Sequence, residues 1–105
     1  MGFLNCASQA FSNDSIRRSA PSASGVYGIS SAREWIYLGE SDDIQARLLE
    51  HLAEKGTALS ERLPAGFSFE LCPPAERTRR HAQLVQELRP ACKLANPQST
   101  RIGRR

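Results

Sequence analysis

Short apolar runs bounded by polar residues mark the first half of the chain. Two runs of β-branched and aromatic residues occupy positions 25–29 and 35–38, and the polar stretch 30–34 separates them. Runs of this composition are typical of β-strands, and a short polar connection between two of them is typical of a hairpin. We therefore expect these two runs to pair as a β-hairpin.

The hairpin predicts a group of apolar and aromatic side chains on one face. If the strands pair symmetrically about Ala32, Tyr27 lies opposite Tyr37. The same register puts Ile29 opposite Trp35. Since side chains alternate between the two faces of a strand, all four would share one face. Two phenol hydroxyls would then stand side by side, which is the first arrangement along the chain that suggests chemistry.

After the hairpin, apolar residues recur with the period of a helix. Gly39 ends the second strand and Ser41 is a favourable N-cap, so we expect a helix over residues 42–55. Its buried stripe recurs every four residues, at Ile44, Leu48 and Leu52. Arg47 and His51 are also four residues apart, which puts them one above the other on a separate face.

Turn residues and strict alternation predict the remaining elements. A shorter helix is expected over residues 58–63, before Pro64 forces a turn. Residues 67–72 alternate strictly and predict a third strand. Its inward side chains should be Phe67, Phe69 and Leu71.

A last helix is expected to begin at Pro74, because proline suits the first helical position. It should run to Leu88 or Arg89, where Pro90 ends it. The inward side chains of this helix should be Leu84, Val85 and Leu88.

Together these elements predict one small domain, since 105 residues leave room for a single core. Residues 1–24 show no sustained period and are expected to form an irregular arm, with one helical turn near residues 15–18. The order of the other elements is β-β-α-α-β-α. This order predicts an α+β fold with a small, largely antiparallel three-stranded sheet flanked by helices. We assign the domain to residues 25–97 and a basic tail to residues 98–105.

Basic residues are unevenly distributed. The net charge is +3, but residues 1–24 carry +1, residues 25–60 carry −3 and residues 61–105 carry +5. A clustered basic surface is what a polyphosphate partner needs, because neutralising phosphates releases counterions. The candidate nucleic-acid-binding residues are Arg77, Arg79, Arg80 and Lys93. The alternative is a solvated helix face and a basic tail that keeps the protein soluble.

The cysteines and the hydropathy of the chain exclude several classes of protein. The three cysteines form no Cys-x-x-Cys pair, which excludes a disulfide scaffold and a cysteine-based zinc site. An odd cysteine count of this kind favours a reduced, cytoplasmic compartment. The longest apolar runs are only a few residues, so no membrane span is expected, and residues 1–11 make a poor signal peptide.

At this point the motifs resemble those of the GIY-YIG endonuclease family. The two triplets are Gly25-Val26-Tyr27 and Tyr37-Leu38-Gly39. The helix motif continues the resemblance with Ser41, Arg47 and His51. Leu84-Val85 and Pro90 are similar to the last helix of the family. The resemblance covers about residues 25–93, and both triplets followed by this helix motif make a specific signature.

The resemblance implies a metal-assisted hydrolase of DNA phosphodiester bonds, with RNA as an alternative partner. It implies that Tyr27 is the general base for the attacking water and that Tyr37 positions phosphate or water. Arg47 would stabilise charge in the transition state, and His51 would hydrogen-bond or shuttle a proton. The implied cofactor is a divalent metal ion, Mg²⁺ or Mn²⁺. A free phenol titrates at about pH 10, so Tyr27 acts as a base only if adjacent cations lower its pKa.

Two positions depart from the family pattern. The metal-binding glutamate of the family corresponds to His81, and an imidazole suits Mn²⁺, Zn²⁺ or Co²⁺ better than Mg²⁺. His81 is therefore a candidate metal ligand or proton donor, or else the relic of a lost site. Glu76 and Glu87 project from other sides of the same helix. Lys93 stands where the family often has asparagine.

Three functions stay open. The chain could be an active nuclease, a degenerate domain that binds nucleic acid or a protein without cleaving, or a structural module that keeps only the fold. Tyr27 and Tyr37 could be ordinary strand aromatics, and Arg47 and His51 part of an ordinary helix face. The convergence of these four groups favours the first two functions, whereas the missing carboxylate favours the last two. We favour the nuclease, and the sequence gives no indication of oligomeric state.

Overall fold

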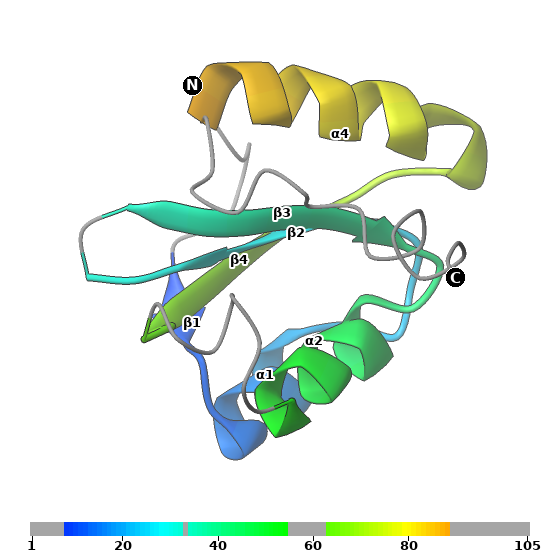
Figure 1. Ribbon diagram of the computed structural model, residues 1–105. Coiled ribbons are helices and arrows are strands. Elements are labelled where there is room, and N and C mark those ends of the chain that lie inside the picture. The colour runs from blue at the N-terminus through cyan, green and yellow to red at the C-terminus, as the bar shows by residue number, and fades with distance from the viewer. Residues whose placement is uncertain (1–7, 33, 55–62, 89–105) are drawn as a thin grey trace, which may run out of the picture.

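A four-stranded antiparallel sheet lies between helices on both of its faces (Figure 1). The computed structural model describes residues 8–32, 34–54 and 63–88. In chain order, the elements are β1 (Gln9–Ala10), α1 (Asn13–Ser19), β2 (Gly25–Ser30), β3 (Trp35–Ser41), α2 (Ile44–Ala53), β4 (Gly66–Leu71) and α4 (Pro74–Leu88). The strand order is β1-β4-β2-β3, with α1 and α2 on one face and α4 on the other. The α+β class and the antiparallel sheet are confirmed.

Residues 8–24 are part of the fold, which corrects the expectation of an irregular arm over residues 1–24 for the described part of that segment. β1 adds a fourth strand, paired with Phe67 and Gly66 of β4. The side chain of Ser12 caps α1, and Ile16 of this helix is fully buried in the core. The helical turn expected near residues 15–18 therefore lies inside a longer helix. The sequence prediction missed its extent because few apolar residues mark this segment.

The hairpin forms as predicted, but in a different register. Tyr27 pairs with Gly39 and not with Tyr37, a displacement of two residues along β3. Ile29 is the residue that pairs with Tyr37. A displacement of two residues leaves the faces of the strands unchanged. Tyr27, Ile29 and Tyr37 therefore share one face, and they belong to the buried cluster that includes Leu48 of α2.

Trp35 does not share that face, and this part of the prediction was wrong. Ile29 pairs with Tyr37 but Ser30 pairs with Trp35, so Ile36 is the extra residue of a β-bulge. A bulge re-aims the side chains that follow it. Trp35 accordingly packs on the opposite face of the sheet, against a cluster formed by Val26, Leu38 and Leu84.

Side chains on β4 are not buried and exposed in the alternation that the sequence predicted. Phe67 is fully buried as predicted, but Leu71 is 55% exposed while Glu70 is only 8% exposed. Because helices cover both faces of the sheet, alternation along a strand no longer separates interior from solvent. A buried glutamate on such a strand must find a partner on the covering helix.

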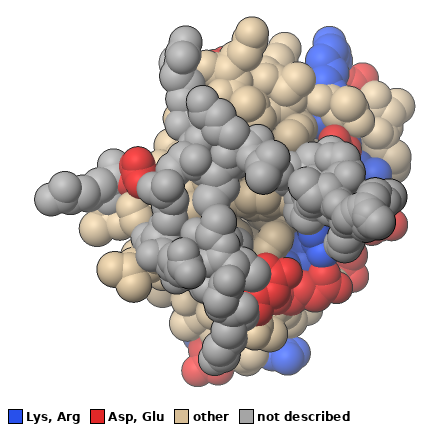
Figure 2. All heavy atoms as spheres, viewed as in Figure 1, with Lys and Arg blue, Asp and Glu red and all other residues tan. Residues whose placement is uncertain are grey.

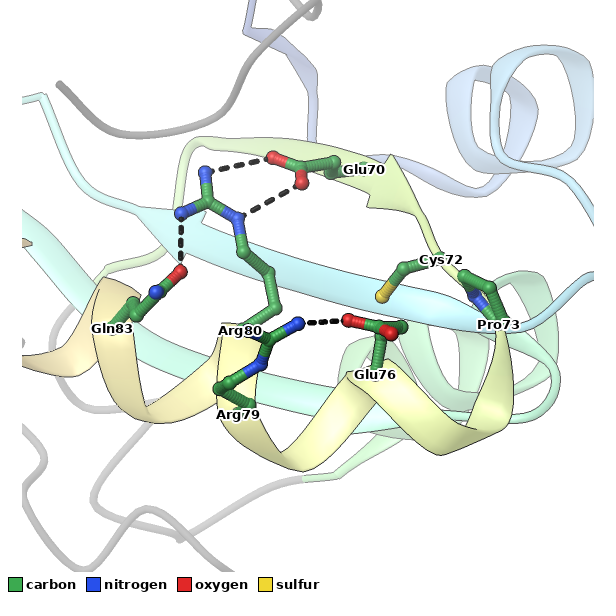
Figure 3. Close-up of a pocket in the computed structure, with 7 residues that line it drawn as sticks. All are labelled: Glu70, Cys72, Pro73, Glu76, Arg79, Arg80 and Gln83. Atoms are coloured by element: carbon green, nitrogen blue, oxygen red, sulfur yellow. Dashed lines mark hydrogen bonds and ion pairs between the residues drawn. The ribbon is translucent and has the colours of Figure 1, made fainter.

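Ion pairs hold the first half of α4 on the sheet. Glu40 and Glu70 lie in one row of the sheet, on either side of Val26. Nε of Arg77 lies 3.4 Å from Oε1 of Glu40. Arg80 donates to both carboxylate oxygens of Glu70, at 2.9 and 3.0 Å (Figure 3). The second half of α4 packs through apolar residues, as the sequence predicted.

The Arg80–Glu70 pair should therefore contribute strongly to stability. We expect Arg80→Ala to lower the free energy of unfolding by about 3 kcal/mol, because it removes both hydrogen bonds that Arg80 donates to the buried carboxylate of Glu70. That side chain is only 10% exposed. Arg79→Ala is the control, since Arg79 pairs with Glu76 but is 70% exposed, and it should cost less than about 1 kcal/mol. Urea unfolding of both variants measures this, and equal losses would contradict the docking role of Arg80.

α2 begins two residues later than predicted. Asp43, and not Ser41, is its N-cap, and the Asp43 side chain accepts a backbone hydrogen bond from the first turn at 3.0 Å. Ser41 Oγ instead accepts from the N–H of Asp43, at 2.9 Å. Ile44 and Leu48 are fully buried as predicted, and His51 is buried with them. The helix therefore presents a titratable ring to the core.

Some predictions lie outside the described residues. These are the short helix over residues 58–63, of which only Leu63 is described and is not helical, Lys93, and the basic tail at residues 98–105. Within the described ranges, no helix combines the length and the apolar character needed to cross a membrane.

Candidate functional site

Four polar side chains predicted as site residues come together between the hairpin and α2. Tyr27 comes from β2, Tyr37 from β3, and Arg47 and His51 from α2. The ring centroids of Tyr27 and Tyr37 are 6.1 Å apart. The His51 ring lies 5.7 Å from Tyr27 and 4.9 Å from Tyr37. The positive charge of Arg47 lowers the pKa of both phenols and of His51. The four side chains are therefore close enough to influence one another electrostatically.

A buried hydrogen bond joins Tyr27 to His51. The Tyr27 hydroxyl is 2.8 Å from Nε2 of His51, and the two residues are 1% and 5% exposed. Burial lowers the pKa of His51 to about 4, and the charge of Arg47 acts in the same direction. The ring is therefore neutral at pH 7 and can accept a hydrogen bond.

Burial has the opposite effect on the phenols. It raises the pKa of Tyr27 to about 12, although the charge of Arg47 lowers it. Burial also raises the pKa of Tyr37 above its ordinary value. Tyr27 thus keeps its proton at neutral pH and donates it to Nε2 of His51. An adjacent cation was expected to lower the pKa of Tyr27 below its ordinary value. Arg47 acts in that direction, but burial has the larger effect and the pKa is raised.

Gly39 makes room for the Tyr27 ring. The two residues are cross-strand partners. A Cβ at Gly39 would lie 2.5 Å from the Tyr27 hydroxyl and 2.6 Å from Cζ. The last residue of the second triplet is therefore glycine because the tyrosine of the first triplet packs against its backbone.

Several buried polar atoms of this cluster lack a hydrogen-bond partner among the described residues. They are the Tyr37 hydroxyl, Nε of Arg47 and Nδ1 of His51. Each such group costs about 1–3 kcal/mol when it is left unsatisfied. Native proteins keep few of these groups, and each one calls for an explanation such as a ligand or a catalytic role. Their convergence on one cluster makes it the candidate functional site.

The low pKa of His51 predicts a pH-dependent stability. Unfolding returns the pKa of His51 from about 4 to about 6.5, so only the unfolded chain gains a proton between these values. The free energy of unfolding should therefore be unaffected by His51 above pH 7. It should fall by about 2 kcal/mol between pH 7 and pH 5.

Urea titrations of the wild type and His51→Gln at several pH values measure this contribution. The variant should lose much less stability than the wild type over the same pH interval. Parallel pH profiles would contradict a buried, neutral His51.

His81 does not join the cluster. Its Nε2 donates to the backbone carbonyl of Leu38, at 2.9 Å. Glu40, two residues further along the same strand, is engaged by Arg77 and Thr78 of α4. In the part of the chain that the structure describes, no group of three or more His, Cys, Asp or Glu could hold a metal ion. Because Mg²⁺ prefers several oxygen ligands, these residues do not fit a magnesium site.

The arginines predicted to contact nucleic acid each face a glutamate. The pairs are Arg77 with Glu40, Arg79 with Glu76, and Arg80 with Glu70. On the face seen in Figure 2, basic and acidic side chains of the described residues are interspersed. A pocket of about 270 Å³ lies between β4 and α4. Figure 3 shows Arg79 and Arg80 beside it, each directed at a carboxylate. Their contact with nucleic acid stays a prediction.

Two acidic residues beside the cluster were not predicted from the sequence. Glu50 forms an ion pair with Arg47. Oε1 of Glu54 lies 3.5 Å from Nδ1 of His51. Each glutamate follows its partner by three positions, a spacing that puts side chains together on a helix and could have identified both.

Comparison with known proteins supports the fold. No protein-family model matches the chain, and a search of curated proteins finds no match. Among solved structures, the GIY-YIG N-terminal endonuclease domain of UvrC from Thermotoga maritima, bound to its catalytic divalent cation magnesium, is similar with a TM-score of 0.62. It is 22% identical, over 72% of this chain and 92% of that chain. A point mutant of that domain, bound to its catalytic divalent cation, is similar with the same TM-score and identity over 72% and 91%. The chain has the GIY-YIG fold, as its motifs predicted.

Proposed function

We propose that the cluster of Tyr27, Tyr37, Arg47 and His51 binds a phosphodiester group of DNA and hydrolyses it. The unsatisfied Tyr37 hydroxyl and Nε of Arg47 carry this proposal, because the oxygens of a phosphodiester complement both donors. Phosphate oxygens accept from the Tyr37 hydroxyl and from the guanidinium of Arg47. The endonuclease domains with the same fold support a nuclease over other phosphate-binding functions.

Tyr27 and His51 act together as the base. The attacking water transfers a proton to the Tyr27 oxygen while the Tyr27 proton passes to Nε2 of His51, across the 2.8 Å hydrogen bond. The water oxygen forms a bond to phosphorus, the bond to the leaving oxygen breaks, and that oxygen takes a proton from solvent. The negative charge of the phosphodiester favours this transfer, because it stabilises the imidazolium that forms.

Arg47 stabilises the charge that develops on the phosphoryl oxygens. Its side chain is 16% exposed, so water screens its charge little. Its present partner, Glu50, is 57% exposed. A phosphate can therefore replace the carboxylate of Glu50 without breaking a buried pair. No step of this proposal runs through a metal ion, since His81 and its neighbours do not form a magnesium site.

A second candidate is a domain that binds DNA without cleaving it. One observation favours it: His81, at the position of the family's metal-binding glutamate, is engaged with the Leu38 carbonyl. In this case the cluster would hold a phosphate group but would lack the charge stabilisation that the leaving oxygen needs.

A supercoiled plasmid distinguishes the two candidates. The full chain is incubated with plasmid in EDTA, Mg²⁺ or Mn²⁺, and nicking is followed on gels while mobility shifts measure affinity. We expect wild type to nick, and Tyr27→Phe to nick at least about 100-fold more slowly with unchanged affinity, because only the proton acceptor is lost. Glu76→Gln, a change on the opposite face of the sheet, should behave as wild type.

Two results would overturn the nuclease proposal. Binding without nicking in any of the three conditions, with nicking by His81→Glu in Mg²⁺, would support the second candidate. Absence of DNA binding even at low salt would reject both candidates.

A further inference from the structure

We propose that Glu54 is a positioning residue that fixes the tautomer of His51 and stabilises the protonated ring during catalysis. The inference rests on the proton-transfer role proposed above for Tyr27 and His51. The observation that carries it is a carboxylate oxygen of Glu54 located 3.5 Å from Nδ1 of His51.

The two ring nitrogens of His51 have different surroundings. Nε2 is 2.8 Å from the Tyr27 hydroxyl. Nδ1 is buried and has no hydrogen-bond partner within the described ranges, and the Glu54 carboxylate faces it from the end of α2. The backbone N–H of Glu54 is bonded to the carbonyls of Glu50 and His51, both at 3.2 Å, which holds the residue at this helix end.

These surroundings select one tautomer. A neutral imidazole carries a single ring proton. With the proton on Nδ1, that nitrogen donates toward the Glu54 carboxylate, and Nε2 is free to accept from Tyr27. With the proton on Nε2, the lone pair of Nδ1 would face a carboxylate, and two acceptors would repel each other. Glu54 therefore favours the only tautomer in which His51 can take the proton of Tyr27.

The charges around the ring give Glu54 its second role. Arg47, on the preceding turn of α2, disfavours a positive charge on His51, and the groups contributed by the strands are the neutral phenols of Tyr27 and Tyr37. Glu50 is engaged by Arg47. Glu54 is thus the carboxylate placed to stabilise the imidazolium once Nε2 has accepted a proton. An acid on the far nitrogen of the base does the same in serine hydrolase triads.

Nitrogen NMR of the 105-residue chain tests the tautomer without any need for activity. The chain has two histidines, so the ring signals are few. Wild-type His51 should carry its proton on Nδ1, whereas His81, whose Nε2 donates to a carbonyl, should show the opposite tautomer and serve as an internal reference. In Glu54→Ala, His51 should become a mixture of both tautomers while His81 stays unchanged.

Glu54→Gln separates the two roles. Its amide oxygen still accepts from Nδ1, so the wild-type tautomer should be retained, but its lost charge should slow plasmid nicking about 10-fold. Glu54→Ala should slow nicking at least as much, and Glu76→Gln should alter neither readout. A proton on Nε2 in wild-type His51, or an unchanged tautomer in Glu54→Ala, would overturn the inference. Expected tautomers in a wild type that never nicks would instead overturn the proposed function and retain Glu54 as the positioning residue of His51.

Discussion

Arg47→Ala is expected to slow DNA cleavage about 1000-fold, the largest loss that we anticipate for a single site residue. The Arg47 side chain is only 16% exposed and its charge lowers the pKa of both phenols, and its Nε has no hydrogen-bond partner among the described residues. Removing it takes away the group that we propose stabilises the developing charge on phosphate. The free energy of unfolding should change little, because the substitution also removes a buried, unsatisfied donor.

Two further measurements make this prediction specific. Since the charge of Arg47 contributes to the low pKa of His51, that pKa should rise above about 4 in Arg47→Ala, which proton NMR can follow. Arg47→Lys keeps the charge but lacks the planar donor geometry, so its cleavage rate should fall between those of wild type and Arg47→Ala. Cleavage that is insensitive to Arg47→Ala would reject the proposed mechanism.

Gly25→Ala is expected to lower the free energy of unfolding by about 3 kcal/mol, because the new methyl group has no space. A Cβ at Gly25 would collide with the backbone carbonyl of Glu70, and it would lie 3.0 Å from Cα of Leu71 and 2.8 Å from Cδ1 of Ile44. A paired strand backbone cannot move without disrupting the sheet. Thermal and urea unfolding measure the loss.

Gly39→Ala provides the matched comparison within the other triplet. Here the methyl group would meet the ring and hydroxyl of Tyr27, a side chain that can shift. We therefore expect a smaller loss of stability than for Gly25→Ala, but a loss of cleavage similar to that of Tyr27→Phe, because the displaced hydroxyl no longer reaches His51. Wild-type cleavage by Gly39→Ala would contradict the proposed role of the Tyr27–His51 hydrogen bond.

Much of the site could be predicted from the sequence because it depends on periodicity. A strand repeats every two residues, so Tyr27 and Tyr37 share a face even though the pairing is displaced by two residues. A helix repeats every three to four residues, so Arg47 and His51 project from α2 together. The same rule, applied to acidic residues, would have identified Glu54.

The features that could not be predicted from the sequence depend on tertiary contacts. No local pattern identifies the bulge at Ile36, which turns Trp35 to the other face of the sheet. The burial of Glu70 depends on Arg80, which lies ten residues away on another element. The pKa values of Tyr27 and His51 follow from burial, which composition and spacing do not reveal.

The bulge at Ile36 also separates the natural fluorophores of the protein. The single tryptophan, Trp35, packs on the α4 side of the sheet, whereas both tyrosines of the chain lie on the α2 side within the candidate site. Tryptophan emission should therefore follow the detachment of α4. Near-ultraviolet circular dichroism of the tyrosines should follow the site. One unlabelled sample can thus report on the two layers of the molecule independently.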